Sequence, residues 1–277
     1  MPPRRLRLDA ELVRRQLARS REHASELISA GRVKVSGVVA TKPATGVTTD
    51  VAIVVVEGAD GPDYVSRGAH KLIGALDAFG ALGLAVEGRR CLDAGASTGG
   101  FTDVLLRRGA REVVAVDVGY GQLAWRIQQD ERVIVHDRTN IRDLSLEVIG
   151  EPVDLIVGDL SFISLTLVLD ALMSVTGPDA DMALMVKPQF EVGKDRVGKG
   201  GVVRDSGLRA EAVLEVAHAA QTRGWGVRAV TTSPLPGPSG NVEFFLWLKR
   251  GGSVVDDEAI TEAVRAQVGL TAPVGAE

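Results

Sequence analysis

The sequence predicts a protein of the α/β class, in which a doubly wound, mainly parallel sheet follows a small, basic α+β unit. From residue 89 onward, short apolar runs of strand length alternate with segments of helical periodicity. A stretch rich in Gly, Pro and Asp, Gly58–Asp63, separates this region from the beginning of the chain. Residues 1–42 hold ten Lys and Arg against four Asp and Glu, whereas the rest of the chain holds 22 against 32. We therefore expect a basic binding module attached to an acidic domain.

Length and composition exclude several classes of protein. The chain has 277 residues, 45% of them hydrophobic and 25% charged, which is ordinary for a globular protein with a sizeable core. It contains no apolar stretch of transmembrane length, and charged residues follow the first three residues too soon for a signal peptide. One Cys and four scattered His give neither a disulfide nor a zinc ligand set. We expect a cytoplasmic protein that binds no metal and no membrane.

The N-terminal unit is predicted to contain two helices and a small sheet. Apolar residues at helical spacing predict a helix over Asp9–Ala18, and Ser20 is a suitable N-cap for a second helix. Alternating residues interrupted by Ser36-Gly37 predict a hairpin over Val33–Val39. A further strand is expected over Val51–Val56.

Basic residues gather where these two helices meet and on the adjoining sheet. Guanidinium groups on a rigid corner can grip phosphates bidentately, and the alternative is a basic face that is only solvated. The pattern that begins at Ala18-Arg-Ser-Arg21 and ends at Gly37 resembles the small RNA-binding module named after ribosomal protein S-four. This resemblance implies recognition of folded RNA, largely by shape and backbone. The candidate RNA-binding residues are Arg4, Arg5, Arg7, Arg19, Arg21, Lys42 and Arg67.

The remainder of the chain alternates between strands and helices. A helix is expected from Ser66 to about Phe79, and five strands with helical crossovers predict a parallel sheet. A Gly/Pro-rich loop, Ser233–Gly240, lets the last two strands pair antiparallel at the far edge. A helix over Asp256–Val268 and a frayed tail end the chain. The strands are expected at Arg89–Asp93, Glu112–Asp117, Val133–His136, Val153–Asp159, Met182–Lys187, Val227–Thr232 and Glu243–Leu248.

A glycine-rich loop after the first of these strands indicates a nucleotide-like cofactor. In Arg90–Phe101 a strand runs into glycines and then a helix, so backbone N–H groups and the helix N-terminus can approach a ligand. The spacing Asp93-x-Gly95-x-x-x-Gly99-Gly100 departs from the Gly-x-Gly-x-x-Gly of dinucleotide-binding folds. The leading carboxylate opposes a pyrophosphate but suits an amino group and a sulfonium. The loop therefore favours S-adenosylmethionine over a glycine-rich turn that binds nothing.

Three consecutive strands of this region each finish with aspartate. Because Asp is depleted in strands and costly to bury without a partner, Asp117, Asp137 and Asp159 are expected at the cofactor crevice. Asp117 is placed to accept from ribose hydroxyls, and Asp137 from the adenine amino group. The candidate cofactor-binding residues are Asp93, Gly95, Ser97, Thr98, Gly99, Gly100, Phe101, Asp117 and Asp137.

The sequence also argues against two kinds of methyl acceptor. Amino-directed base methylation generally uses Asn/Asp-Pro-Pro-Tyr at the end of the fourth strand, where this chain has Asp159-Leu-Ser-Phe-Ile-Ser164. Attack through a base carbon needs a cysteine nucleophile, and Cys91 lies inside the first strand as a small hydrophobe. A hydroxyl acceptor remains, and it requires alignment with the methyl donor and a positioned base.

Two lysines stand where such a base is needed. Lys187 ends the fifth strand, and Lys71 lies in the helix before the first strand, although a lone lysine at a strand end is usually a solvated surface group. With Asp159 and Glu243 they match the Lys-Asp-Lys-Glu tetrad of the FtsJ-like ribose 2′-O-methyltransferases. The resemblance implies that Lys187 is the base and that Lys71 assists it and grips RNA. It further implies that Asp159 orients donor or acceptor and that Glu243 holds Lys71 or the ribose.

The whole chain except its tail resembles the TlyA-type rRNA methyltransferases, through motifs such as Asp159–Ser164, Val186–Glu191 and Gly200–Arg204. The resemblance implies a Rossmann-like, seven-stranded domain that uses S-adenosylmethionine, preceded by the S-four-like module. It also implies 2′-O-methylation of cytidine in 16S or 23S rRNA within ribosomal subunits. We divide the chain into the module (residues 1–60), a linker (61–66), the methyltransferase domain (67–251) and a C-terminal helix and tail (252–277).

Two other functions stay open on the sequence alone. The family often carries the older label hemolysin, which implies membrane lysis, although no apolar membrane segment is visible. A non-catalytic ribosome assembly factor could keep the same fold. Some relatives place a basic and a Trp residue before the Val-Ser-Arg-Gly segment, whereas this chain has Pro62, Asp63 and Tyr64, so no switching role of the linker is carried over.

Overall fold

The computed structural model describes residues 5–18, 20–56, 64–237, 239–251, 256–267, 270 and 271. The chain divides into two compact units, Met1–Asp63 and Tyr64–Glu277, and each has its own core. Two of the predicted RNA-binding residues, Arg4 and Arg19, lie outside the described residues, as do residues 61–63 of the predicted linker and the end of the predicted tail.

The first unit packs two helices against short strands. Helix α1 (Leu8–Arg14) and helix α2 (Arg21–Ser29) bury a shared core that includes Leu12 and Ile28. Ser20 caps α2 as predicted, because its side chain accepts a hydrogen bond from the backbone N–H of His23. Helix α1 is shorter than predicted: it ends at Arg14, because Gln16 has a left-handed backbone (φ 59°) that cannot continue the helix.

The strands of this unit include one pair that the sequence did not predict. The predicted hairpin forms from β2 (Val33–Val35) and β3 (Val38–Val39), and β5 (Ile53–Val55) pairs with the other side of β2. In addition, β1 (Leu6–Arg7) pairs antiparallel with β4 (Gly46–Val47). Two-residue strands of this kind are too short to produce an alternating pattern, so only the contact between distant segments reveals them.

The second unit is built on one mixed sheet whose strand order is β13-β11-β12-β10-β9-β6-β7-β8. All seven predicted strands are present, the first five of them parallel, and β12 lies antiparallel between β10 and β11. Short β13 adds an eighth strand at the edge. The bounds are β6 Arg90–Ala94, β7 Glu112–Val116, β8 Val133–His136, β9 Val153–Gly158, β10 Thr176–Val186, β11 Trp225–Thr232, β12 Phe244–Arg250 and β13 Leu270–Thr271.

Strand β10 is longer than the sequence predicted. The expected strand began at Met182, but Thr176 already pairs with Val153 before an irregularity that lasts until Asp181. This segment contains Gly177-Pro178, a pair that predicts a turn. A strand can contain such a pair only where its hydrogen bonds to the neighbouring strand are interrupted.

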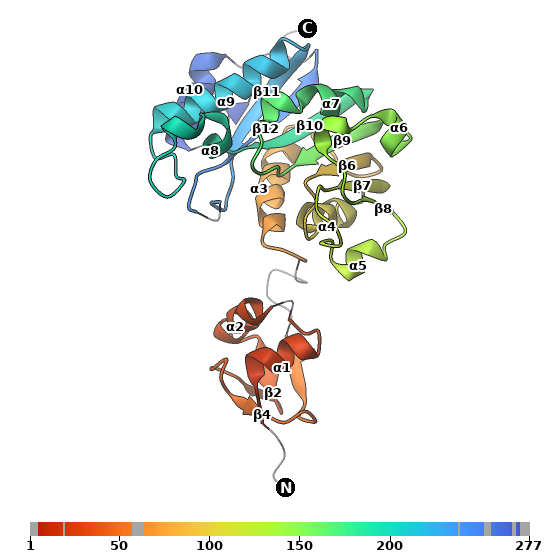
Figure 1. The fold of residues 1–277 in the computed structure, drawn as a ribbon, viewed down its shortest axis with the longest axis vertical. Helices are drawn as coiled ribbons and strands as arrows, with labels where there is room; N and C mark the ends of the chain where they lie inside the picture. Colours follow the sequence, from red (N-terminus) through yellow and green to blue (C-terminus); the bar gives the residue numbers. More distant parts are fainter. Residues whose placement is uncertain are drawn as a thin grey trace. The chain divides into compact units, whose positions relative to one another are not determined.

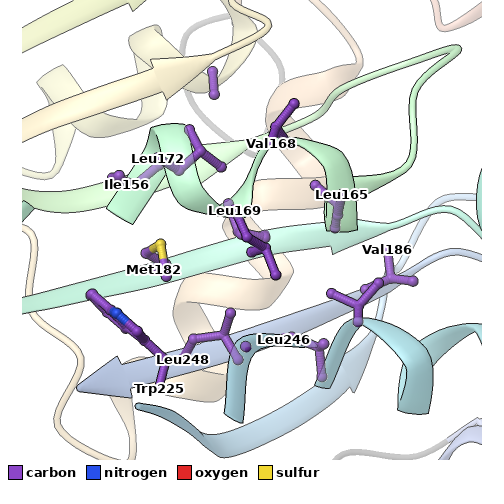
Figure 2. Close-up of a cluster of buried hydrophobic side chains, with 14 of the residues drawn as sticks. Ile156, Leu165, Val168, Leu169, Leu172, Met182, Val186, Trp225, Leu246 and Leu248 are labelled. Carbon is purple, nitrogen blue, oxygen red and sulfur yellow. The ribbon is translucent and has the colours of Figure 1, made fainter. Parts of the chain in front are cut away.

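Helices cover both faces of the sheet (Figure 1), which confirms the doubly wound architecture. Alternate residues of β10 face opposite cores: Met182 and Leu184 pack toward α7, α9 and α10, whereas Ala183 and Met185 pack toward α3 and α4. Figure 2 shows the first of these cores, where Leu169 and Leu172 of α7 meet Ile156, Met182 and Leu248 of the sheet. The main helices are α3 Gly68–Gly80, α4 Gly100–Arg107, α7 Leu169–Ser174, α9 Ser206–Gln221 and α10 Asp257–Ala266, and the one-turn helices are α5 Trp125–Gln128, α6 Leu146–Ile149 and α8 Pro188–Glu191.

The order of the strands fixes where a ligand can bind. From β6 the chain continues to β7 and β8 on one side, and then crosses to β9 and β10 on the other side. In doubly wound sheets the crevice outside the carboxyl ends of the strands at such a reversal is the ligand site. Here the reversal lies between β6 and β9, the strands that end at Ala94 and Gly158.

Candidate active site

The loop after β6 turns so tightly that two of its glycines are required. Gly95 and Gly99 have φ values of 85° and 91°, in the left-handed region that other residues avoid. A Cβ on Gly95 would lie 3.2 Å from the backbone oxygen of Asp159, and one on Gly99 would lie 2.8 Å from Leu123. The loop therefore lies directly against the residues that follow β9 and β7.

Asp93 lies beneath this loop and is fully buried. Its Oδ2 accepts a hydrogen bond from Thr102 Oγ1 at 2.7 Å, whereas its Oδ1 has no hydrogen-bond partner among the described residues. Burial raises the pKa of the Asp93 carboxyl to about 7, and its bonds with Thr102 counteract this only in part. A buried carboxylate with an orphaned oxygen fits a cationic group brought by a ligand, such as an amino group.

A cavity of about 420 Å³ opens at the strand reversal, a size that suits a small-molecule ligand. A hollow of about 500 Å³ is larger but is lined by residues of α9 and α10, whereas the smaller cavity lies at the strand ends, where the fold places a ligand. The residues that line the smaller cavity are Gly95, Ser97, Val116, Asp117, Val118, Gln122, Thr139, Asn140, Ile141, Asp159, Leu160, Ser161, Phe162 and Ile163.

The predicted aspartates after β7 and β8, Asp117 and Asp137, differ in how they lie relative to this cavity. Asp117 lines it and accepts from the backbone N–H groups of Ser97 and Gly119 at 2.8 and 2.7 Å, which leaves lone pairs for further donors. Asp137 accepts from the N–H of Gly121 at 2.9 Å, and the nearby lining residues are Thr139 and Asn140.

Three other members of the predicted cofactor-binding set contact neighbouring parts of the protein. Phe101 is buried in the core and stacks on Phe245, with 6.1 Å between the ring centroids. The backbone oxygen of Thr98 accepts from Ala124 N at 3.1 Å. Gly100 packs so closely on Ser66 that a Cβ would lie 2.1 Å from its Oγ.

The structure brings the four members of the predicted tetrad together. Lys71 Nζ lies 2.6 Å from Glu243 Oε2 and 4.0 Å from Asp159 Oδ2. Lys187 Nζ lies 2.6 Å from the other oxygen, Asp159 Oδ1. Both ammonium groups and the Glu243 carboxylate are buried, and Asp159 lies between the two lysines. Two cations and two anions balance, as a buried ionic group requires.

The sheet register explains why residues so distant in sequence meet. Val186, the last residue of β10, pairs with Phe244, the first residue of antiparallel β12. Lys187 and Glu243 directly follow and precede these two residues, so both lie at the same edge of the sheet. Asp159 directly follows β9, which is parallel to β10 and adjacent to it.

Three polar residues in the segments that carry the tetrad were not among the predicted site residues, and two of them contact it. Ser161 accepts from Lys187 Nζ at 2.7 Å, and Gln189 Nε2 donates to Glu243 Oε1 at 3.2 Å. Buried Glu191 accepts from the Ser164 hydroxyl and, at 3.0 Å, from Leu165 N, so it holds the segment after β9 against α8. Burial raises the pKa of Glu191. All three lie in motifs quoted from the sequence, but their side-chain partners come from other segments.

The loop before β12 depends on a glycine beside the tetrad. A Cβ on Gly237 would lie 2.5 Å from Glu243 Oε1 and 3.0 Å from its Cδ. Because Glu243 is buried and held by Lys71, it has little room to retreat. We expect Gly237→Ala to displace Glu243 and to lower the rate of methyl transfer about 10²-fold, the cost of a misplacement near 1 Å.

The control for this prediction is Gly80→Ala at the end of α3, where a Cβ meets nothing within 4 Å and the backbone is helical. It should keep full activity in the same methyl-transfer assay. Full activity of Gly237→Ala would show that the position of Glu243 does not limit the reaction.

The basic residues of the first unit occupy an exposed surface, and some are already paired. Arg7 and Arg21 both bind Asp9, and both remain more than half exposed. Arg5 and Lys42 are exposed in the first unit, and exposed Arg67 lies just before α3 in the second.

Within the described ranges, no helix is long and apolar enough to cross a membrane. In the same part of the chain, no three His, Cys, Asp or Glu side chains are grouped so that they could hold a metal ion.

Comparison with known proteins shows close similarity over both units. The FtsJ-like methyltransferase family matches residues 64–250, and the S4 domain family, the S-four module, matches residues 6–53. The 16S/23S rRNA (cytidine-2′-O)-methyltransferase TlyA of Mycobacterium tuberculosis is 62% identical over 246 residues, which cover 89% of this chain and 90% of that protein. A candidate rRNA methyltransferase of Bacillus subtilis, YqxC, is 39% identical over 95% of this chain and 92% of its own.

A solved structure shares the arrangement as well. A candidate hemolysin from Streptococcus thermophilus has 34% identity and a TM-score of 0.72, and the match covers 95% of this chain and 96% of that one.

Proposed function

The chain belongs to the TlyA family of FtsJ-like methyltransferases, and from this premise we propose that it transfers a methyl group from S-adenosylmethionine to the 2′-hydroxyl of cytidine in ribosomal RNA. The observation that carries the proposal is the meeting of Lys71, Asp159, Lys187 and Glu243 beside the cavity at the strand reversal. The name of the 62% identical relative supports cytidine and ribosomal RNA as the target, and an rRNA substrate implies a cytoplasmic enzyme.

The residues at the strand ends fit S-adenosylmethionine. When bound, this cofactor supplies an electrophilic methyl group on a sulfonium. Gly95 and Ser97 of the glycine loop line the cavity. Asp117 offers acceptors for hydroxyls, and the orphaned Oδ1 of Asp93 suits the amino group. Asp159 lines the same cavity and also touches both lysines, so it connects the cofactor site with the tetrad.

Lys187 is the residue we assign to the acceptor hydroxyl. A ribose hydroxyl attacks well only as its proton leaves, and a positioned amine can take that proton. Lys187 is buried, and its Nζ lies 2.6 Å from Asp159 Oδ1, so Asp159 holds the amine beside the cavity that it lines. Glu243 holds Lys71 in this arrangement, and Gln189 holds Glu243.

Phe162 offers a surface for the target base. Its side chain is 91% exposed, it lines the cavity, and its ring lies 5.2 Å from that of Phe190. Its backbone is left-handed (φ 64°), a strained conformation for a bulky residue and one that often marks functional sites. Single-stranded RNA is commonly held by stacking bases on aromatic rings, so Phe162 can position a nucleotide beside Lys187.

The test is the chemical identity of the product. Ribosomal subunits from a host that lacks the modification are incubated with the protein and S-adenosylmethionine, and their RNA is digested and analysed by mass spectrometry. We expect new 2′-O-methylcytidine, and assays on separate small and large subunits identify which rRNA carries it. A different methylated nucleoside, or none, contradicts the proposal, and dye leakage from liposomes would favour the membrane-lytic alternative.

A further inference from the structure

Two arginines of the first unit share one buried carboxylate. Arg7 donates from Nε to Asp9 Oδ1 at 3.1 Å and from Nη2 to Oδ2 at 2.9 Å. Arg21 donates from its Nη2 to the same Oδ2, also at 2.9 Å. The two Nη2 atoms therefore lie within twice that distance of each other, although Arg7 belongs to β1 and Arg21 begins α2.

The shared carboxylate is rigid, whereas the arginines still face solvent. Asp9 is 3% exposed, its backbone N–H binds Pro43 O at 3.0 Å, and its Oδ1 also accepts from Ala10 N at 2.8 Å. The side chains of Arg7 and Arg21 are 52% and 61% exposed. The bond to Pro43 also fixes the segment next to Lys42, a third candidate RNA-binding residue.

We propose that Asp9 is a positioning residue for RNA binding, which holds Arg7 and Arg21 side by side as a preformed clamp for one backbone phosphate. The bidentate pair uses the Nε and Nη2 edge of Arg7, so the Nη1 hydrogens stay outside it. Arg21 is bound to Asp9 through Nη2. Two guanidinium groups fixed in this way can each donate to a phosphate without first losing side-chain freedom. The inference depends on the proposed function, because it assumes that the first unit binds ribosomal RNA.

The charge on Asp9 makes this inference sharply testable. If only net charge mattered, removal of an anion from a basic surface would strengthen binding to a polyanion. If the clamp matters, the same change weakens binding, since both arginines must then be ordered when the RNA arrives. Hydrogen bonds from Arg7 lower the pKa of Asp9 to about 2, so the carboxylate is ionised throughout the neutral range.

The experiment compares two isosteric variants with the same change in charge. Asp9→Asn removes the shared anion, and Glu11→Gln is the matched control. Glu11 is fully buried in the same helix and pairs with Arg14 and Arg15, which are not candidate RNA-binding residues. We measure the Kd for unmethylated ribosomal subunits, the KM for subunits, kcat, the affinity for S-adenosylmethionine, and the thermal unfolding of each variant.

Asp9→Asn is expected to raise the Kd and the KM for subunits about tenfold, with kcat at saturating subunits and cofactor affinity unchanged. Glu11→Gln should leave the Kd unchanged or lower it. In a background of Arg7→Ala and Arg21→Ala, Asp9→Asn should have no further effect, because nothing is left to position.

Three results overturn the inference. The first is an unchanged or stronger affinity of Asp9→Asn. The second is an equal loss in both variants, which would reflect the stability of the module. The third is an additive effect of Asp9→Asn in the double-alanine background. If the wild-type protein itself fails to bind or methylate subunits, the proposed function fails instead, and the two failures are thereby distinguished.

Discussion

Replacement of Lys187 by alanine is expected to lower the rate of methyl transfer about 10³-fold, while the affinities for RNA and for the cofactor stay nearly unchanged. A positioned base contributes about 10²–10⁴-fold to such a reaction. Lys187 Nζ is the amine that touches both Asp159 and Ser161 at the cavity, and Lys71 Nζ is held by Glu243. The measurement is a single-turnover rate with labelled S-adenosylmethionine and unmethylated subunits, together with separate binding assays.

Lys187→Arg separates a base from a positioning cation. A guanidinium can still pair with Asp159 and donate to Ser161, but it does not accept a proton at neutral pH. We therefore expect the arginine variant to remain close to the alanine variant in rate. Substantial activity in Lys187→Arg would show that the cation, and not the base, is what the reaction needs.

Lys249→Ala is the control for loss of a lysine. Lys249 also pairs with a buried carboxylate, Asp181 at 3.2 Å, but it lies near the other end of β12. It should keep the wild-type rate. Full methyl transfer by Lys187→Ala would contradict the catalytic role, and an unchanged cellular phenotype without methylation would favour a ribosome assembly factor.

The site could be predicted from the sequence to the extent that the strand ends define it. Asp117, Asp159 and Lys187 all lie at or just beyond the carboxyl ends of parallel strands, and a doubly wound sheet places such ends at one edge. Glu243 is harder to predict from the strand ends, because its position depends on β12 running antiparallel between β10 and β11. It was predicted as a site residue because the sequence resembles the Lys-Asp-Lys-Glu tetrad of the FtsJ-like methyltransferases.

Partnerships between side chains could not be predicted in the same way. Nothing in the spacing shows that Arg7 and Arg21 share Asp9, or that Phe101 turns into the core toward Phe245. Periodicity reports which face of an element is apolar, whereas these contacts depend on how distant elements pack. The same limitation explains the early end of α1, which follows from the left-handed backbone of a single residue, Gln16.

Asp93 is the position where cofactor binding and stability are expected to conflict most. Its carboxyl has a pKa raised to about 7 by burial, so in the folded protein it resists ionisation, whereas an unfolded Asp ionises near its ordinary value of 3.8. The stability of the cofactor-free protein is therefore reduced as the pH rises from about 4 to about 7, and the loss is constant above that. Asp93→Asn carries no such charge.

The unfolding free energy of Asp93→Asn is consequently expected to rise relative to that of wild type as the pH increases. The difference should grow by about 2–3 kcal/mol between pH 5 and pH 8. For a domain of this size the gain corresponds to about 5–10 °C in Tm. Asp103→Asn is the contrasting control: Asp103 is almost as buried, but it accepts from Val65 N, Arg107 and Arg126. Its replacement should lower the Tm throughout this range. A Tm difference between Asp93→Asn and wild type that does not change with pH would contradict the raised pKa.

The same substitution should cost about 10²-fold in affinity for S-adenosylmethionine at pH 8, because a buried charge pair would be lost. In the wild type, affinity should fall by up to tenfold for each pH unit below about 7, since the proton must leave Asp93 before it can receive the cofactor's amino group. In Asp93→Asn the affinity should be flat over that range. Titration calorimetry at several pH values measures both. A stabilised variant that binds the cofactor as tightly as wild type would assign Asp93 to the loop's structure alone, and the orphaned Oδ1 would then need another explanation.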